Sequence, residues 1–206
     1  NNAPMPKSAT APVAVSVTSG NLDKGKAAID FGTIEYAEPG TYVYKVSEKN
    51  AGTTVDGIAY SKNVAKITVT VTPNKKGVLS ADVKVAWSEA GETEFKNVYT
   101  AKPVESSVTD EIAVAKSLTG RDLTAGEFSF ELREIVDKEE KPVETVTNDA
   151  SGKVTFKAIK YTEIGQHTYK LHEVKGSAGG ITYDDATYTI VTTITDNGKG
   201  KLVATH

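Results

Sequence analysis

A glutamate that ends a repeated strand is the first candidate for chemistry in this sequence. The stretch Gly40–Glu48 (GTYVYKVSE) returns as Gly165–Glu173 (GQHTYKLHE) at a constant offset of 125, since 173 − 48 = 125. Alternate residues of an extended strand share a face, so Glu48 and Glu173 lie on the apolar faces of their strands. We therefore predict that each copy aims a carboxyl group at a core, where burial favours a neutral acid or a paired carboxylate.

Two further polar side chains share apolar strand faces. Lys116 lies on the face of the aliphatic residues of Glu111–Leu118, and Asn97 lies between the aromatic residues of Glu94–Tyr99. A buried amine favours its neutral form, which is a nucleophile, and a protonated Glu can polarise an Asn carbonyl. Because folding can align these groups, the set predicts a Lys–Asn isopeptide bond formed with loss of ammonia. Such a bond forms once per molecule, so we do not expect an enzyme that turns over.

Short strands are the elements that must position these residues. Ile and Val alternate with Thr in Ala65–Thr72, and a turn leads back into Leu79–Trp87, which predicts a β-hairpin. A second hairpin is expected from Tyr183–Thr195 and Leu202–Ala204, and an early strand at Pro12–Thr18. Further strands are expected at Gly126–Leu132 and Val154–Tyr161, separated by an acidic loop at Asp137–Glu140 and a turn at Asn148–Gly152. Since no segment shows a sustained helical period, we predict an all-β chain of two tandem Ig-like β-sandwich domains.

The repeat also predicts the domain boundaries. The 206 residues divide into domains at 1–103 and 104–206, and the hairpins align at an offset of 123 (183 − 60 = 123). The counterpart of Asn97 would fall at 97 + 123 = 220, beyond His206, and the counterpart of Lys116 would precede residue 1. We therefore expect the first domain to lack its opening strands and the second to lack its closing strand.

Composition narrows the classes of partner and site. The net charge is −3 and the pI is about 5.7, which gives no electrostatic reason to expect nucleic acid as a partner. No apolar run approaches the roughly 20 residues of a membrane span, so we expect no membrane insertion. The chain has no cysteine, and His167, His172 and His206 lack partners at ligand spacing, so we expect no metal site and no cofactor.

Three motifs carry a resemblance to a known family. Ala115–Leu132 (AKSLTGRDLTAGEFSFEL) resembles the opening of the isopeptide-forming, CnaB-type Ig-like domains of Gram-positive pilins, the family of the streptococcal major pilin. Tyr44–Glu48 and Tyr169–Glu173 are similar to the strand of that family that carries the catalytic Glu. Phe95–Tyr99 is similar to its closing strand, which carries the Asn.

The resemblance implies a role for each candidate residue. Lys116 and Asn97 would be crosslinking residues, and Glu48 and Glu173 would be the assisting acids, although neither predicted domain contains both a crosslinking Lys and an Asn. It also implies an extracellular protein anchored to the cell wall, with neighbouring stalk domains or pilin subunits as partners. The implied function is that of a structural stalk or shaft segment of a surface pilin or adhesin.

Three alternatives remain open from the sequence. The loops Lys49–Ile58 and Lys175–Ile181 could make the chain an adhesin module that binds a host protein or glycan. A glycan-active enzyme with Glu48 or Glu173 as its acid is disfavoured, because no second inward carboxylate lies nearby in the sequence. Strand exchange would join Asn97 of one chain to Lys116 of another.

Overall fold

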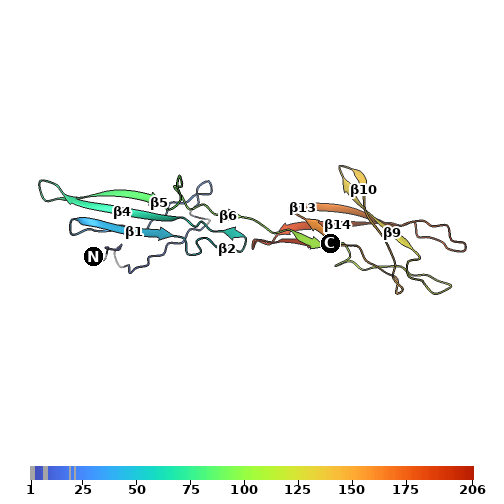
Figure 1. Cartoon of the computed structure of the whole chain (residues 1–206). Helices are drawn as coiled ribbons and strands as arrows, with labels where there is room; N and C mark the ends of the chain where they lie inside the picture. Colours follow the sequence, from blue (N-terminus) through green and yellow to red (C-terminus); the bar gives the residue numbers. More distant parts are fainter. Residues whose placement is uncertain (1–2, 7–8, 19, 21) are drawn as a thin grey trace. The chain divides into compact units, whose positions relative to one another are not determined.

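The chain is built from strands. The computed structural model describes residues 3–6, 9–18, 20 and 22–206, and these contain no helix (Figure 1). The predicted all-β class is confirmed. The chain divides into two compact units: unit 1 comprises Asn1–Thr53 and Tyr60–Lys96, and unit 2 comprises Thr54–Ala59 and Asn97–His206.

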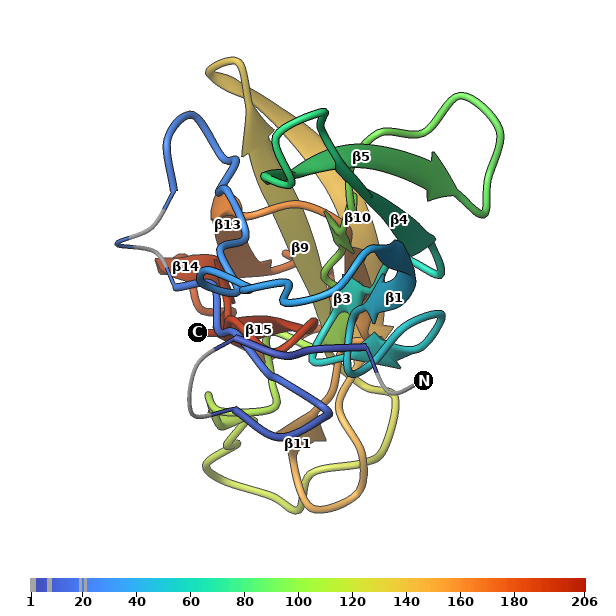
Figure 2. The ribbon, with the colours of Figure 1, turned by 90° about the vertical axis from the view of Figure 1, so that its left-hand side faces the viewer.

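Unit 1 contains a twisted, antiparallel sheet of three strands in the order β1–β4–β5 (Figure 2). Its strands are β1 (Gly40–Ser47), β4 (Val64–Pro73) and β5 (Leu79–Trp87). The turn between β4 and β5 is closed by Asn74, whose side-chain carbonyl accepts the backbone N–H groups of Lys76 and Val78 at 2.8 and 3.0 Å. The predicted first hairpin is therefore present.

The apolar face of this sheet is only partly covered. Among the residues of unit 1 that the structure describes, the buried hydrophobic ones are Ala65, Val69 and Val71, whereas Val83 and Val85 of β5 are 58% and 53% exposed. The prediction of a strand at Pro12–Thr18 is wrong, because these residues form no strand. An alternating segment becomes a strand only when a neighbouring strand accepts and donates its hydrogen bonds, and none does so here.

Unit 2 is a sandwich of one large sheet and two short strand pairs. The antiparallel sheet has the order β10–β9–β13–β14–β15, and the short pairs are β7 with β12 and β8 with β11. The bounds are β7 (Val104–Ser106), β8 (Val114–Ala115), β9 (Ser129–Val136), β10 (Glu139–Thr147), β11 (Lys153–Val154), β12 (Ile159–Tyr161), β13 (Gly165–Glu173), β14 (Thr187–Asp196) and β15 (Leu202–Thr205). Side chains of both layers meet in one core, which includes Phe128, Leu132, Val154, Phe156 and Tyr169. Burial of these large apolar side chains holds the layers together.

Unit 2 also contains a small three-stranded sheet outside this sandwich. It has the order β2–β3–β6, with β2 (Thr54–Val55), β3 (Ile58–Ala59) and β6 (Val98–Tyr99). The turn between β2 and β3 consists of Asp56 and Gly57, both with positive φ (48° and 82°), as a two-residue hairpin turn of type I′ requires.

Strand β10 was missed by the sequence analysis, which predicted an acidic loop at Asp137–Glu140. Asp137 and Lys138 instead form a two-residue turn with φ of 55° and 71°, and β10 follows directly. The Asp-Gly or Asn-Gly signature of such turns is absent, and a register shift between Pro142 and Glu144 interrupts the alternation. Neither feature leaves a recognisable strand pattern.

The repeat is preserved in the backbone pairing of both units. Tyr44 opposite Ile67 recurs as Tyr169 opposite Ile190, at the predicted offsets of 125 (169 − 44) and 123 (190 − 67). Likewise, Val71 opposite Ala81 recurs as Ile194 opposite Ala204. The two copies therefore share one register across three strands.

A pair of tyrosines also recurs. The hydroxyl oxygens of Tyr36 and Tyr44 lie 3.1 Å apart, and those of Tyr161 and Tyr169 lie 3.0 Å apart. Burial, and then the hydrogen bond to the partner hydroxyl, raise the pKa values of Tyr44 and Tyr169 well above the ordinary range of tyrosine. Each pair ties its Glu strand to the segment that precedes it.

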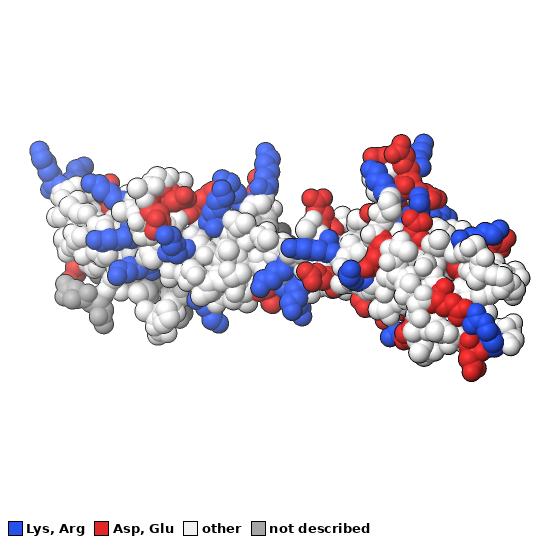
Figure 3. All heavy atoms as spheres, turned by 45° about the vertical axis from the view of Figure 1, so that its right-hand side comes forward, with Lys and Arg blue, Asp and Glu red and all other residues white. Residues whose placement is uncertain are grey.

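Charged side chains of both signs are mixed on the surface. On the face shown in Figure 3, basic and acidic residues are interspersed over each unit. That face carries no broad surface region with charge of a single sign.

Candidate functional site

Lys116 and Glu173 form a buried ion pair in unit 2. Lys116 Nζ lies 2.8 Å from Glu173 Oε2, and their side chains are only 11% and 3% exposed. Lys116 follows β8 directly, and Glu173 is the last residue of β13. The structure thus brings together two of the four predicted site residues, from opposite layers of the sandwich.

The backbone and an aromatic ring position Lys116. Its N–H donates to the carbonyl oxygen of Gly152 at 2.7 Å. Gly152 has a φ of +87°, and a Cβ at that position would collide with the carbonyl oxygen of Lys116. Nζ lies 4.3 Å from the centroid of the Phe128 ring, within the range of a cation–π contact. The nitrogen is therefore held between a carboxylate and an apolar ring.

Glu173 has one carboxylate oxygen engaged and one available. Oε2 accepts hydrogen bonds from Lys116 Nζ and from the backbone N–H of Asp184 at 3.1 Å. Oε1 is buried and has no hydrogen-bond partner among the described residues. A buried acceptor without a donor is costly, so this oxygen marks a position where a further N–H or O–H group would be stabilised.

Glu48 repeats one of these contacts in unit 1. Its Oε2 accepts the backbone N–H of Ser61 at 2.9 Å, which corresponds to the Asp184 contact because 61 + 123 = 184. The Glu48 side chain is half-buried. Both repeated acids therefore accept a backbone donor from the loop that follows their strand. Sequence reasoning missed these donors, since any residue type can supply a backbone N–H.

Asn97 does not lie where the sequence predicted. It is exposed, directly precedes β6, and is not part of the cavity that surrounds Lys116 and Glu173. The prediction that Asn97 points into a core is wrong. The strand that follows it consists of only two residues, and Tyr99 in it is 44% exposed, so this segment is not packed under a second layer.

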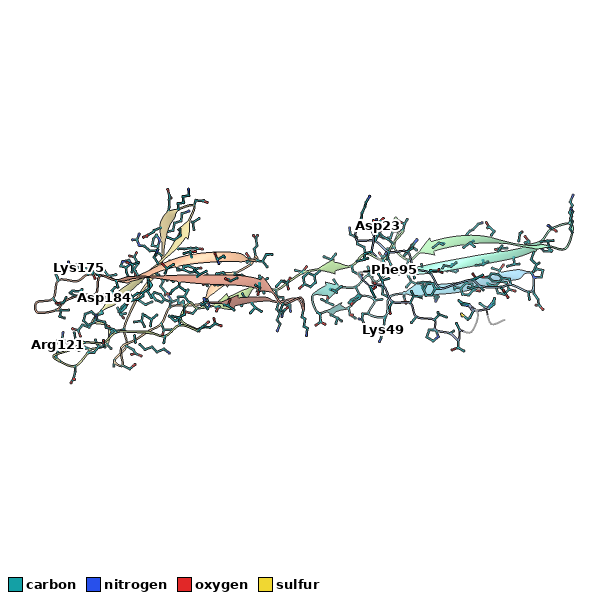
Figure 4. The ribbon with its side chains drawn as sticks, turned by 180° about the vertical axis from the view of Figure 1, so that it is seen from behind. Asp23, Lys49, Phe95, Arg121, Lys175 and Asp184 are labelled. Atoms are coloured by element: carbon teal, nitrogen blue, oxygen red, sulfur yellow. The ribbon has the colours of Figure 1, made fainter. Side chains whose placement is uncertain are left out.

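An open cavity of about 450 Å³ adjoins the ion pair. Ile112–Ser117 line one side, Tyr188–Ile190 line the other, and Lys116 and Glu173 both contribute to the lining. Asp184, which donates to Glu173, also lines it and lies at the same end of unit 2 as the loop of Lys175 (Figure 4). The site is thus accessible from outside the sandwich.

The repeat indicates what shape fits this cavity. In unit 1, β4 is paired with β5 as far as Ala65, which is buried. In unit 2, β14 is paired with β15 only from Thr193 to Asp196, and Tyr188, the counterpart of Ala65, is 58% exposed. The cavity therefore follows a strand edge that has no partner among the described residues, and an extended peptide has the matching shape.

The histidines have other neighbours. His167 Nδ1 lies 2.7 Å from Glu134 Oε1, and His206 Nε2 lies 2.7 Å from Ser106 Oγ. The part of the chain that the structure describes has no group of three His, Asp or Glu side chains that could hold a metal ion. It also contains no helix able to cross a membrane.

A comparison with protein families identifies the family of this chain. The family model FctA, described as a Spy0128-like isopeptide containing domain, matches residues 1–100 and 112–206. No curated protein matches the chain. The two matched segments account for nearly the whole chain and agree with the tandem repeat, and the predicted resemblance is confirmed. The chain belongs to the FctA family of Spy0128-like isopeptide containing domains.

Proposed function

We propose that this chain is a load-bearing segment of a pilin-type surface protein, and that unit 2 joins Lys116 to an asparagine through an isopeptide bond. The family match supports a pilin-type structural domain. The observation that carries the finer proposal is the buried Lys116–Glu173 pair, which retains an available carboxylate oxygen beside an open cavity. An ion pair with a purely structural role would have no need of either feature.

The chemistry follows from the position of the proton. Transfer of one proton from Lys116 Nζ to Glu173 Oε2, across 2.8 Å, converts the ion pair into a neutral amine and a carboxylic acid without changing the net charge. The amine attacks Cγ of the asparagine, the Nζ–Cγ bond forms and the Cγ–Nδ2 bond breaks. The Glu173 carboxylic acid protonates Nδ2, and the resulting carboxylate takes a proton from Nζ, so that neutral ammonia leaves and Glu173 ends as the carboxylic acid.

The asparagine would arrive on an extended segment that fills the cavity beside β14. The closing segment of the first copy, Phe95–Tyr99, provides the pattern for such a strand. An asparagine in register would approach Lys116, and its side-chain N–H could donate to Glu173 Oε1. Alignment of this kind is what allows an unactivated amide to react.

The mechanical consequence supports the assignment to a stalk. A bond from Lys116 to a closing strand would link the early strand β8 to the last strand of the sandwich, so a pull on the ends would pass through a covalent link. By analogy with a disulfide that closes a loop of about 100 residues, the link would stabilise the unit by about 4–5 kcal/mol.

Mass spectrometry of an extended variant tests the proposal. A second copy of Lys84–Ala101 placed directly after His206 begins at position 207 (84 + 123) and sets its asparagine at 220 (97 + 123), in register with the repeat. We expect an intact mass about 17 Da below that of the sequence, one ammonia, and a proteolytic fragment that joins Lys116 to the new asparagine.

Lys116→Ala, Glu173→Ala and replacement of the added asparagine by alanine are the matched controls, and each should restore the full mass. An unchanged mass in the extended variant, with the unit folded, would refute the proposed bond.

A further inference from the structure

Unit 2 has a second cavity, of about 410 Å³, whose lining shares no residue with the cavity beside Lys116. Three segments of this unit line it: Thr54–Ala59, Thr100–Lys102 and Lys199–Lys201. Lys102, Lys199 and Lys201 all contribute to its lining, and Asp56 is the only carboxylate among the described residues that does so. The lining therefore has a formal charge of +2 (three lysines minus one aspartate).

The backbone holds two of these lysines side by side. Lys102 and Lys201 oppose one another in a parallel bridge, in which Lys102 N–H donates to Gly200 O and Leu202 N–H donates to Lys102 O, both at 2.9 Å. Like charges at adjacent strand positions are destabilising. Among the described residues, no ion pair involves Lys102, Lys199 or Lys201. The fold thus concentrates positive charge here, and the Asp56 carboxylate offsets only part of it.

The walls of this cavity are fixed by close backbone packing. A Cβ added to Gly57 or to Gly200 would collide with the other glycine's Cα, so neither position accepts a side chain. Thr100 N–H donates to Gly57 O at 2.9 Å, and Gly200 N–H donates to the Tyr99 hydroxyl at 3.1 Å. The lysine-bearing segments are therefore positioned before any ligand arrives, which reduces the entropic cost of binding.

We propose that this cavity binds a phosphate group, as free phosphate or as a phosphodiester of an anionic polymer. Lysine ammonium groups are common phosphate ligands, and a phosphate offers enough acceptor oxygens to engage several donors at once. The hydroxyl-bearing residues Thr54 and Thr100 also line the cavity and supply neutral donors. Asp56 opposes an anion, so it sets a limit on the affinity.

NMR titration of the whole chain tests this inference. Inorganic phosphate is compared with sodium chloride at equal ionic strength, with the amides of Gly57, Thr100 and Gly200 as reporters. We expect saturable shifts with phosphate alone, about fivefold weaker binding for each Lys→Gln change at 102, 199 or 201, and loss of binding in the triple variant. Asp56→Asn, which keeps a residue suited to positive φ, should bind several-fold more tightly because it removes the repulsion.

The matched control is the triple variant Lys66→Gln, Lys75→Gln and Lys76→Gln, which removes the same charge from exposed positions of unit 1. Unchanged binding in this control supports a defined site. Equal weakening in both triple variants, or shifts that chloride reproduces, would overturn the proposal. A poly(glycerol phosphate) oligomer that binds at least tenfold more tightly than phosphate would identify a polymer as the ligand, whereas equal affinity would identify the free anion.

Discussion

Lys116 and Glu173 compensate one another in a place where either charge alone would be costly. The free-energy cost of removing two charges from water often exceeds the gain from their mutual attraction. A buried ion pair is therefore a poor means of stabilising a fold. Its presence beside an open cavity is the observation from which we propose isopeptide chemistry. The backbone donor to the repeated acids, from Ser61 in one copy and Asp184 in the other, shows that this one contact is built twice.

Removing one member of this pair should therefore destabilise unit 2 strongly. We expect Glu173→Gln to lower the free energy of unfolding by about 3–5 kcal/mol, because the Lys116 ammonium would remain buried without a counter-charge. The double variant Lys116→Met, Glu173→Leu should recover most of this loss. Urea unfolding of the whole chain measures both.

The control is Glu89→Gln in the Lys62–Glu89 pair, in which the Lys62 side chain is 73% exposed and the Glu89 side chain is 47% exposed. It should cost less than about 1 kcal/mol. Equal losses in the single and double variants of the buried pair would show that the charges are not coupled.

Tyr169, which is buried, and Tyr44, which is partly buried, predict how stability depends on alkaline pH. Because the folded state raises the pKa values of Tyr44 and Tyr169, it holds these protons more tightly than the unfolded chain does. Their contribution is complete below the ordinary tyrosine value of about 10 and is lost as the pH rises above it. We expect part of the tyrosinate absorbance to appear only together with unfolding, and Tyr169→Phe to reduce that late part. A single titration that is complete before unfolding would contradict this.

At the scale of elements, the turn that precedes β11 controls the position of Lys116. Gly152→Ala should cost more than the roughly 1–2 kcal/mol of a left-handed alanine, because its Cβ would also displace the Lys116 carbonyl. Gly198→Ala is the matched control, since Gly198 has a φ of +69° and no atom within 4 Å of an added Cβ. Urea unfolding compares the two, and the extended variant should crosslink less with Gly152→Ala. Equal costs would show that the collision is relieved.

Local alternation predicts a strand correctly where it agrees with burial, and it fails where a partner distant in sequence decides the structure. The hairpin of β4 and β5 and the strand that ends at Glu173 follow from alternation that the sheet then uses. Pro12–Thr18 has the same local pattern but no neighbouring strand. The two flanking aromatics predict that Asn97 lies inward, yet Tyr99 on the same face is 44% exposed, so this face is not covered.

At the scale of the whole chain, the two units have unequal cores. Unit 1 buries mainly small aliphatic side chains and leaves Val83 and Val85 exposed, whereas unit 2 buries several aromatic ones, such as Phe128 and Tyr169. Since stability follows the apolar area removed from water, unit 1 should be the weaker of the two.

Hydrogen exchange can show this difference directly. We expect the amides of β5 to exchange faster than those of β14, and urea to unfold unit 1 before unit 2. A single cooperative transition with equal exchange in both strands would show instead that the units stabilise one another.

The loop that follows each Glu strand has diverged between the copies while the strand register has not. In unit 2, the residues from Val174 to Gly180 are exposed, and the loop is two residues shorter than its counterpart, which carries β2 and β3. The two copies thus differ in the length of this loop while their sheets keep the same register. A foreign epitope inserted between Ser177 and Ala178 should be displayed on a scaffold that keeps the native pairing of its strands. This loop is therefore a suitable insertion site for vaccine or sensor design.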